Sequence, residues 1–213
     1  MRNRWLLVIL LCCAPALADK NRREAEKVVT GIQDSLKRVG SVQQSSGGRR
    51  EDLSCNVGWT ESVLVTDNLG CKVTFSQTGA NVQTCAKDGT NEKSIVSNEW
   101  ENKISIDLGT LDASTVGLKE RKNETLNDFP NTTTGKIYEL SLAAKRQYRV
   151  ISWSSKLKYT SRGSKTPENA DVRTDHQEGV WDRFAFMVND ETQGQRLAKT
   201  FSQAIALCSA TKK

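Results

Sequence analysis

The chain has 213 residues, of which 26% are charged and 37% are hydrophobic, and its formal net charge is +6. Basic and acidic residues are mixed along the chain, whereas a nucleic-acid-binding face needs Lys and Arg gathered on one side. The composition therefore argues against a nucleic-acid partner and indicates ordinary solvated surface charge.

Residues 1–18, "MRNRWLLVILLCCAPALA", have the form of a secretory signal peptide. Arg2 and Arg4 precede an unbroken apolar run over residues 5–13, and small residues lead to a predicted cleavage near Ala18. The apolar run is too short for a stable membrane anchor, although an uncleaved anchor is the alternative. Loss of the two arginines lowers the net charge from +6 to +4, and we expect a secreted or periplasmic protein with no transmembrane segment after cleavage.

Four cysteines remain after cleavage, and an even number in an oxidising compartment predicts two disulfides. Their spacing does not match the short paired spacings of a zinc site, and we expect no metal or other cofactor. The four residues are Cys55, Cys71, Cys85 and Cys208.

An amphipathic helix is predicted over residues 19–39, because its apolar residues recur at helical spacing. Its apolar stripe would dock on the main domain, pair with another chain or touch a membrane, and docking is the commonest arrangement. Residues 40–52, "GSVQQSSGGRRED", are rich in Ser, Gln and Gly and predict a flexible linker. The helix and the remainder of the chain are therefore expected to be separate units. The stripe consists of Ala25, Val28, Val29, Ile32, Leu36 and Val39.

Residues 53–209 are predicted to form one mainly β domain. Short segments with alternating apolar residues, such as "KISIDL" and "KIYELSL", are typical of half-buried antiparallel strands. We count seven or eight of them, and in the last, "GVWDRFAFMV", we expect Phe184, Phe186 and Val188 to face the core. No helical period interrupts the series, which argues against a parallel α/β sheet.

An amphipathic helix is predicted to end the domain, followed by a short tail over residues 210–213. Asn189 or Asp190 can cap it, and if Asp190 is the cap, Gln193 stands at the capping-box spacing. We expect this helix to cover the open end of a bent seven-stranded sheet or partly open barrel, tied there by a disulfide. The preferred pairing is Cys55 with Cys208, and Cys71 with Cys85 across a hairpin. The apolar stripe of the helix is Leu197, Phe201, Ala204, Ile205 and Cys208.

The order "KISIDLGTLDASTV", "YRVISWSSK" and "FAFMVNDETQGQRLAKTFSQAIALC" resembles pleckstrin-homology-like domains of exported bacterial proteins of unknown function. The opening "CNVGWTE", with Cys55 and Trp59, is also similar to the start of such domains. The resemblance covers roughly residues 53–209. It implies a bent seven-stranded sheet capped by a C-terminal helix, and it implies no activity.

The single histidine, His176, is the only candidate base for a hydrolase. Asp171, Asp175 and Glu178 surround it in sequence, and carboxylates near an imidazole can raise its pKa and orient it. Residues 160–179 are strongly polar, so we expect an exposed loop with a solvated histidine. No catalytic residue is predicted.

Two long loops are the candidate recognition segments, since loops on a rigid β scaffold commonly bind partners. One spans residues 121–136 and contains Leu126, Phe129 and Pro130; the other, residues 160–179, contains His176.

Two further sequence features bear on the surface. Asn123 and Asn131 match the glycan acceptor pattern. We expect most of the four tryptophans outside the signal to be in the core, with Trp100 the most exposed.

These features favour an exported, non-catalytic interaction module for a protein or cell-envelope ligand. A hydrolase using carboxylates and His176 is one alternative. The other is an assembly subunit that pairs through residues 21–39.

Overall fold

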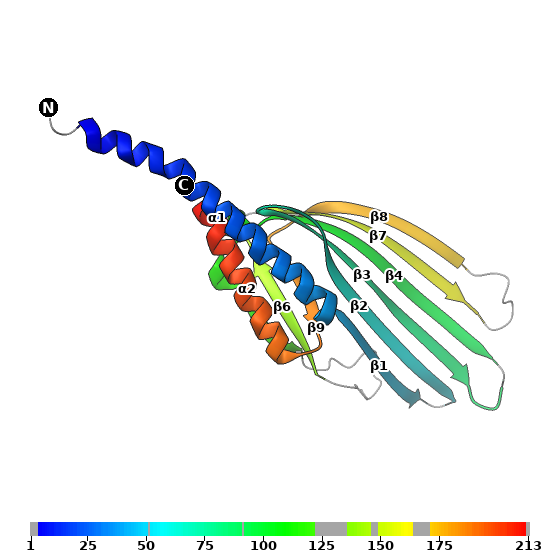
Figure 1. Ribbon diagram of the computed structural model, residues 1–213. Coiled ribbons are helices and arrows are strands. Elements are labelled where there is room, and N and C mark those ends of the chain that lie inside the picture. The colour runs from blue at the N-terminus through cyan, green and yellow to red at the C-terminus, as the bar shows by residue number, and fades with distance from the viewer. Residues whose placement is uncertain are drawn as a thin grey trace.

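The computed structural model describes residues 4–50, 52–90, 92–121, 136–145, 149–163 and 171–211, with side chains described from Lys20 onward except at positions 46 and 50. Figure 1 shows two helices on one end of a long, curved β-sheet. A large antiparallel sheet has the strand order β1-β2-β3-β4-β7-β8, and a small sheet has the order β5-β6-β9.

The strands of the large sheet are long, and several extend well past the helices (Figure 1). They are β1 (Ser41–Arg50), β2 (Leu53–Leu69), β3 (Lys72–Lys87), β4 (Lys93–Asp107), β7 (Ile151–Arg162) and β8 (Asp171–Trp181). The small sheet contains β5 (Gly117–Arg121), β6 (Ile137–Ala143) and β9 (Arg183–Val188). The predicted class is confirmed: the fold is mainly β, antiparallel, and carries a C-terminal helix, although the sheet stays open and does not close into a barrel.

Helix α2 (Glu191–Ala210) begins as predicted. The Asp190 carboxylate accepts a hydrogen bond of 2.7 Å from the Gln193 backbone N–H, which satisfies a donor that the first helical turn leaves unpaired. The predicted stripe from Leu197 to Cys208 is buried, and it packs with Phe75, Phe184 and Phe186 in one core. The ring centroids of Phe75 and Phe184 are 5.2 Å apart.

Helix α1 (Arg4–Val39) docks on the same core. Its buried residues Ala25, Val29, Ile32, Leu36 and Val39 belong to the cluster that contains the α2 stripe, and α1 packs against both α2 and β2. Docking is therefore confirmed, and the expectation of two separate units is wrong.

The predicted linker over residues 40–52 is also wrong, because residues 41–50 form strand β1. β1 pairs with β2 from Ser41↔Ser62 to Arg50↔Leu53. It is an edge strand held by backbone hydrogen bonds to β2, and half of its described side chains are exposed while Val42 is buried. A Ser, Gln and Gly sequence is therefore compatible with a strand at this position.

The two predicted disulfides form, but their pairing was wrong: Cys55 bonds to Cys85, and Cys71 bonds to Cys208. The hairpin expected between Cys71 and Cys85 does not form, because β3 runs unbroken from Lys72 to Lys87. Fourteen extended residues span about 45 Å, which is far too long for one disulfide. Cys55 instead lies directly opposite Cys85 in the β2–β3 register.

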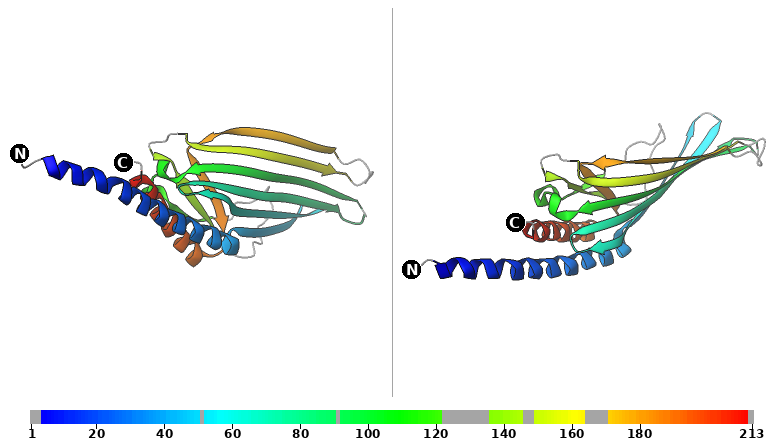
Figure 2. Two further views of the ribbon diagram at one scale, coloured as in Figure 1. Left: turned by 45° about the horizontal axis from the view of Figure 1, so that its top comes forward. Right: turned by 90° about the horizontal axis from the view of Figure 1, so that it is seen from above.

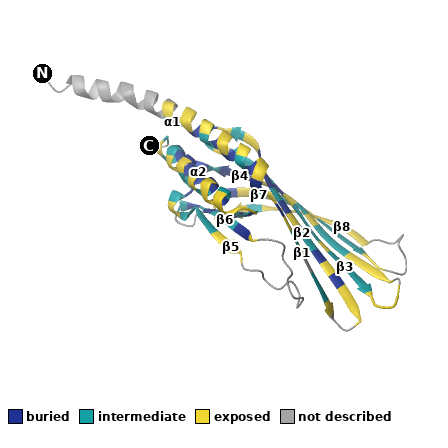
Figure 3. Ribbon diagram, turned by 60° about the horizontal axis from the view of Figure 1, so that its bottom comes forward, coloured by how far each residue is buried: buried dark blue, intermediate teal, exposed yellow. Residues whose placement is uncertain are grey.

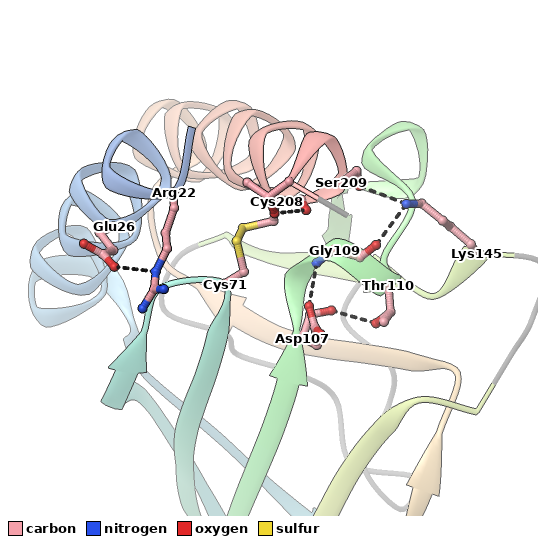
Figure 4. Close-up of a disulfide and its surroundings, with 10 residues drawn as sticks. Arg22, Glu26, Cys71, Asp107, Gly109, Thr110, Lys145, Cys208 and Ser209 are labelled. Atoms are coloured by element: carbon pink, nitrogen blue, oxygen red, sulfur yellow. Dashed lines mark hydrogen bonds and ion pairs between the residues drawn. A yellow bond between two sulfur atoms is a disulfide. The ribbon is translucent and has the colours of Figure 1, made fainter. Parts of the chain in front are cut away.

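Cys71 lies in the tight turn before β3, beneath the end of α2 (Figure 4). Lys145 supports the same corner, where its ammonium donates to the Gly109 carbonyl at 3.0 Å and to the Ser209 hydroxyl at 2.8 Å. The end of α2 is thus tied to the sheet covalently and by hydrogen bonds. Two disulfides also fit an extracellular or periplasmic protein.

Candidate functional site

The two faces of the large sheet carry different chemistry. We call the side that holds the core residues Phe75 and Ile104 the inner face, and the opposite side the outer face. Because side chains alternate along a strand, β4 directs Asn98, Trp100 and Asn102 to the inner face. Its intervening residues, Glu99, Glu101 and Lys103, go to the outer face.

Strand β7 repeats this separation. Leu157 and Tyr159 belong to the inner face, and Lys156 and Lys158 belong to the outer face. The Lys158 ammonium lies 3.5 Å from the Glu99 carboxylate, which confirms that the charged side chains of β4 and β7 share one side.

The strand register brings aromatic and amide side chains into one row across the inner face. The pairs Gln44↔Trp59, Trp59↔Asn81, Asn81↔Asn98 and Asn98↔Tyr159 run from β1 to β7. Adjacent strands are about 4.8 Å apart, so Trp59 and Tyr159 are separated by roughly 14 Å, with two asparagines between them.

Trp100 lies one row closer to the core. Its ring atoms Cζ2 and Cε2 lie only 2.2 and 2.4 Å from the place where a Cβ on Gly79 would stand. The indole therefore rests against the β3 backbone, and only glycine leaves room for it. We name the set Trp59, Trp100, Tyr159, Gln44, Asn81 and Asn98 the aromatic face.

The sheet extends beyond the helices (Figures 2 and 3). The Gly40 carbonyl, just after α1, accepts a hydrogen bond of 2.7 Å from the Val63 backbone N–H, and the aromatic face begins further along β2, at Trp59. In the part of the chain that the structure describes, no helix packs over that end of the sheet. Its three rings are partly exposed, and the Cys55–Cys85 disulfide ties β2 to β3 on the same face.

A buried polar network separates the aromatic face from the core. The Glu61 carboxylate accepts a hydrogen bond of 2.9 Å from the Met187 backbone N–H. The Gln77 amide donates to the Ala185 carbonyl at 3.4 Å, and Asn102 donates to Gln77 at 3.2 Å. These bonds satisfy the free edge of β9 and join the small sheet to the large one.

Glu61 is the charged member of this network and is only 7% exposed. Burial raises the pKa of its carboxyl, although hydrogen bonds from Met187 and Gln77 oppose that shift. The carboxylate accepts the hydrogen bond from Met187 of β9, so its role is to join the two sheets.

The outer face forms two shallow, open depressions with mixed charge. One, of about 470 Å³, is lined by Thr60, Thr78, Glu99 and Lys158, among others. The other, of about 540 Å³, is bordered by Lys103, Lys156, His176 and Glu178.

His176 does not lie in a loop, as we expected, but in the exposed edge strand β8. An edge strand with water on both sides needs no apolar residues, which is why its polar sequence predicted a loop. Alternation puts His176 on the side of Glu178 and away from Asp171 and Asp175. The three acids that surround His176 in the sequence are therefore not gathered around its imidazole.

The recognition segment predicted over residues 121–136 lies largely outside the described residues. Leu126, Phe129 and Pro130 belong to the part that is not described, as do Asn123 and Asn131. Among the described residues, no group of three or more His, Cys, Asp or Glu side chains is arranged to hold a metal ion.

The tryptophans differ from the expectation that most are core residues. All four are partly buried, and Trp153 and Trp181 stack at 4.5 Å beside the core. Sequence reasoning missed the aromatic face, although the alternation in "SNEWENK" separates amides and Trp100 from the charges.

Comparisons of the chain with protein-family models, with curated proteins and with solved structures found no match. Among the residues whose structure is described, no helix is both long and apolar enough to cross a bilayer.

Proposed function

We propose that this protein is an exported, non-catalytic binding module whose ligand contacts the aromatic face. The observation that carries the proposal is the placement of three partly exposed rings and several amides on a disulfide-tied region of sheet that no described helix covers. Aromatic residues supply contact area at low entropic cost, and amides both donate and accept hydrogen bonds.

Export is part of the proposal and rests on residues 1–18 together with the two disulfides. The first buried residue among the described side chains of α1 is Ala25. Cleavage near Ala18 would therefore keep every α1 residue that is described as buried in the core.

Two alternatives have less support. A hydrolase would rely on His176, whose side chain lies on an exposed edge strand away from Asp171 and Asp175. An assembly subunit that pairs through residues 21–39 would need a second apolar face, because the stripe of that helix is buried within the chain.

A relationship to pleckstrin-homology-like domains also remains a proposal. Its support is the pattern of apolar positions over residues 53–209 and the final helix that ends near Cys208. An experimental structure of such an exported domain with the same strand order would support it, and a different order would contradict it.

The binding function can be tested with the exported protein, whose intact mass should match a chain that begins at Asp19 and contains both disulfides. Protein, lipid and carbohydrate fractions of the native envelope and medium are titrated against it while tryptophan fluorescence is followed. We expect saturable binding to one fraction, loss of that binding in a Trp59→Ala/Tyr159→Ala double variant, and recovery of the ligand chemically unchanged. Lys158→Ala, which alters the outer face next to Tyr159, is the matched control.

Chemical conversion of a fraction by the wild type, lost in His176→Ala, would show instead that the protein is an enzyme. Binding that survives the double variant would place the ligand elsewhere on the protein.

A further inference from the structure

We infer that the ligand of the aromatic face is a neutral polysaccharide, an inference that rests on the proposed binding function. Sugar rings have an apolar C–H face, which packs on aromatic rings, and a rim of hydroxyl groups. Those hydroxyls need partners that can both donate and accept, which is the property of Asn and Gln side chains. The aromatic face interleaves these two groups.

The distribution of charge argues for a neutral ligand. Within β2, β3, β4 and β7, the inner-face positions from Glu61 outward to Cys55 carry no charged side chain except Glu61 itself. The other charge in these inner-face rows is confined to the edge strand β8, where Asp175, Arg173 and Asp171 lie opposite Leu157, Tyr159 and Ser161. Glu61 is buried and bonded to Met187. Arg173 on the edge strand β8 is paired with Asp171 at 3.0 Å.

The lysines that an anionic polymer or an anionic lipid surface would require lie on the opposite side. Lys103, Lys156 and Lys158 all belong to the outer face. An acidic ligand on the aromatic face would therefore gain little electrostatic attraction from these lysines. The binding of a neutral ligand does not depend on such attraction.

The geometry argues for a chain rather than a single sugar. Trp59 and Tyr159 are roughly 14 Å apart across four strands, with Asn81 and Asn98 between them. Trp100 lies beside this row, over Gly79. The row of side chains reaches from the edge strand β1 to β7, next to the other edge strand, so it suits an internal stretch of a polymer that crosses the strands.

The test uses the exported protein and defined oligosaccharides. Hexasaccharides of glucose, mannose, xylose and N-acetylglucosamine are titrated by calorimetry and tryptophan fluorescence, with a galacturonic acid hexamer and phosphatidylglycerol vesicles as acidic probes. We expect at least one neutral hexamer to bind, with little change in Kd between low and high salt because no ion pair is involved.

Substitutions then locate the site. Trp59→Ala and Tyr159→Ala should each weaken binding of that hexamer by about tenfold or more, because each removes a stacking platform. Lys158→Ala should leave it unchanged. Gly79→Ala should also weaken it, by displacing Trp100, whereas Gly58→Ala should not, since a Cβ there has no neighbour closer than 4.0 Å.

Two results would overturn the inference. One is binding of only the acidic probes, with strong salt dependence and loss in Lys158→Ala. The other is failure of all neutral hexamers while a native protein or lipid fraction still binds the wild type and not the Trp59→Ala/Tyr159→Ala variant. The second result would leave the binding function standing and reject the carbohydrate alone, so the two proposals fail separately.

Discussion

At the scale of single residues, the contact between the two sheets depends on a few polar side chains. Glu61 and Gln77 satisfy the Met187 N–H and the Ala185 carbonyl at the free edge of β9. A buried backbone group without a partner costs about 1–3 kcal/mol. These side chains therefore supply the hydrogen bonds that a neighbouring strand would otherwise make to β9.

Substitution of Glu61 should change both the free energy of unfolding and its pH dependence. Glu61→Ala removes the acceptor of the Met187 N–H and should lower the free energy of unfolding by about 1–3 kcal/mol. Glu61→Gln keeps a carbonyl oxygen there and removes the ionisable group. Urea unfolding of the wild type and both variants from pH 4 to pH 8 measures the effect.

The sign of the pH effect follows from the raised pKa of Glu61. A group whose pKa is higher in the folded state stabilises the fold fully below its ordinary pKa, about 4.3. That stabilisation is lost as the pH rises through the raised pKa. The wild type should therefore lose stability relative to Glu61→Gln over that window. A constant difference between them at every pH would show that Glu61 does not titrate in this way.

At the scale of elements, the stability of the docked helix α1 comes from its apolar stripe, and Gly31 contributes nothing to it. Ile32 is 1% exposed within the core, whereas Gly31 faces solvent and a Cβ there would meet nothing within 4 Å. Two adjacent residues of one helix therefore lie in opposite environments.

Ile32→Ala and Gly31→Ala should shift stability in opposite directions. The first leaves a cavity and should cost about 2–5 kcal/mol. The second removes backbone freedom in an exposed helix and should add about 0.5–1 kcal/mol. Thermal unfolding of the exported protein measures both, and equal melting temperatures for Ile32→Ala and the wild type would show that α1 does not dock as described.

The edge strands β1 and β8 show where pattern recognition fails at this scale. Alternation of apolar and polar residues identifies a strand with one dry face and one wet face. β8 is exposed along most of both faces, and β1 is exposed along much of its length. β1 pairs with β2 and β8 pairs with β7 through backbone hydrogen bonds. These bonds do not depend on residue type, so the sequence pattern does not reveal them.

At the scale of the whole molecule, the two disulfides hold different ends of the structure. Cys71–Cys208 ties the end of α2 to the covered end of the sheet, and Cys55–Cys85 joins β2 to β3 at the uncovered end. Their sequence separations are 137 and 30 residues.

Removal of each disulfide should therefore have a different cost. Cys71→Ser/Cys208→Ser releases the larger loop and should cost about 5 kcal/mol in the chain-entropy model, against about 3.5 kcal/mol for Cys55→Ser/Cys85→Ser. Unfolding of the two double variants in urea tests this order. In Cys55→Ser/Cys85→Ser, hydrogen exchange should rise mainly at the end of the sheet that extends beyond the helices. A larger loss of stability in this variant than in Cys71→Ser/Cys208→Ser would contradict the expected order.

The sequence by itself determined the class of the fold and its buried stripes. The α2 stripe and the inward-facing Phe184, Phe186 and Val188 follow from local periodicity. The start of α2 follows from the two capping candidates Asn189 and Asp190, of which the structure uses Asp190. Local spacing is enough there, because a helix or strand with one apolar side must bury that side wherever it packs.

Only the tertiary structure decided the disulfide pairing, the two edge strands and the aromatic face. Cys55 meets Cys85, and Trp59 is placed in line with Tyr159, through strand register between residues far apart in the chain. Register depends on which strands become neighbours, and no local pattern encodes that choice. The candidate site could not be seen in the sequence for this reason: its residues lie on five different strands and become one surface only when those strands are paired.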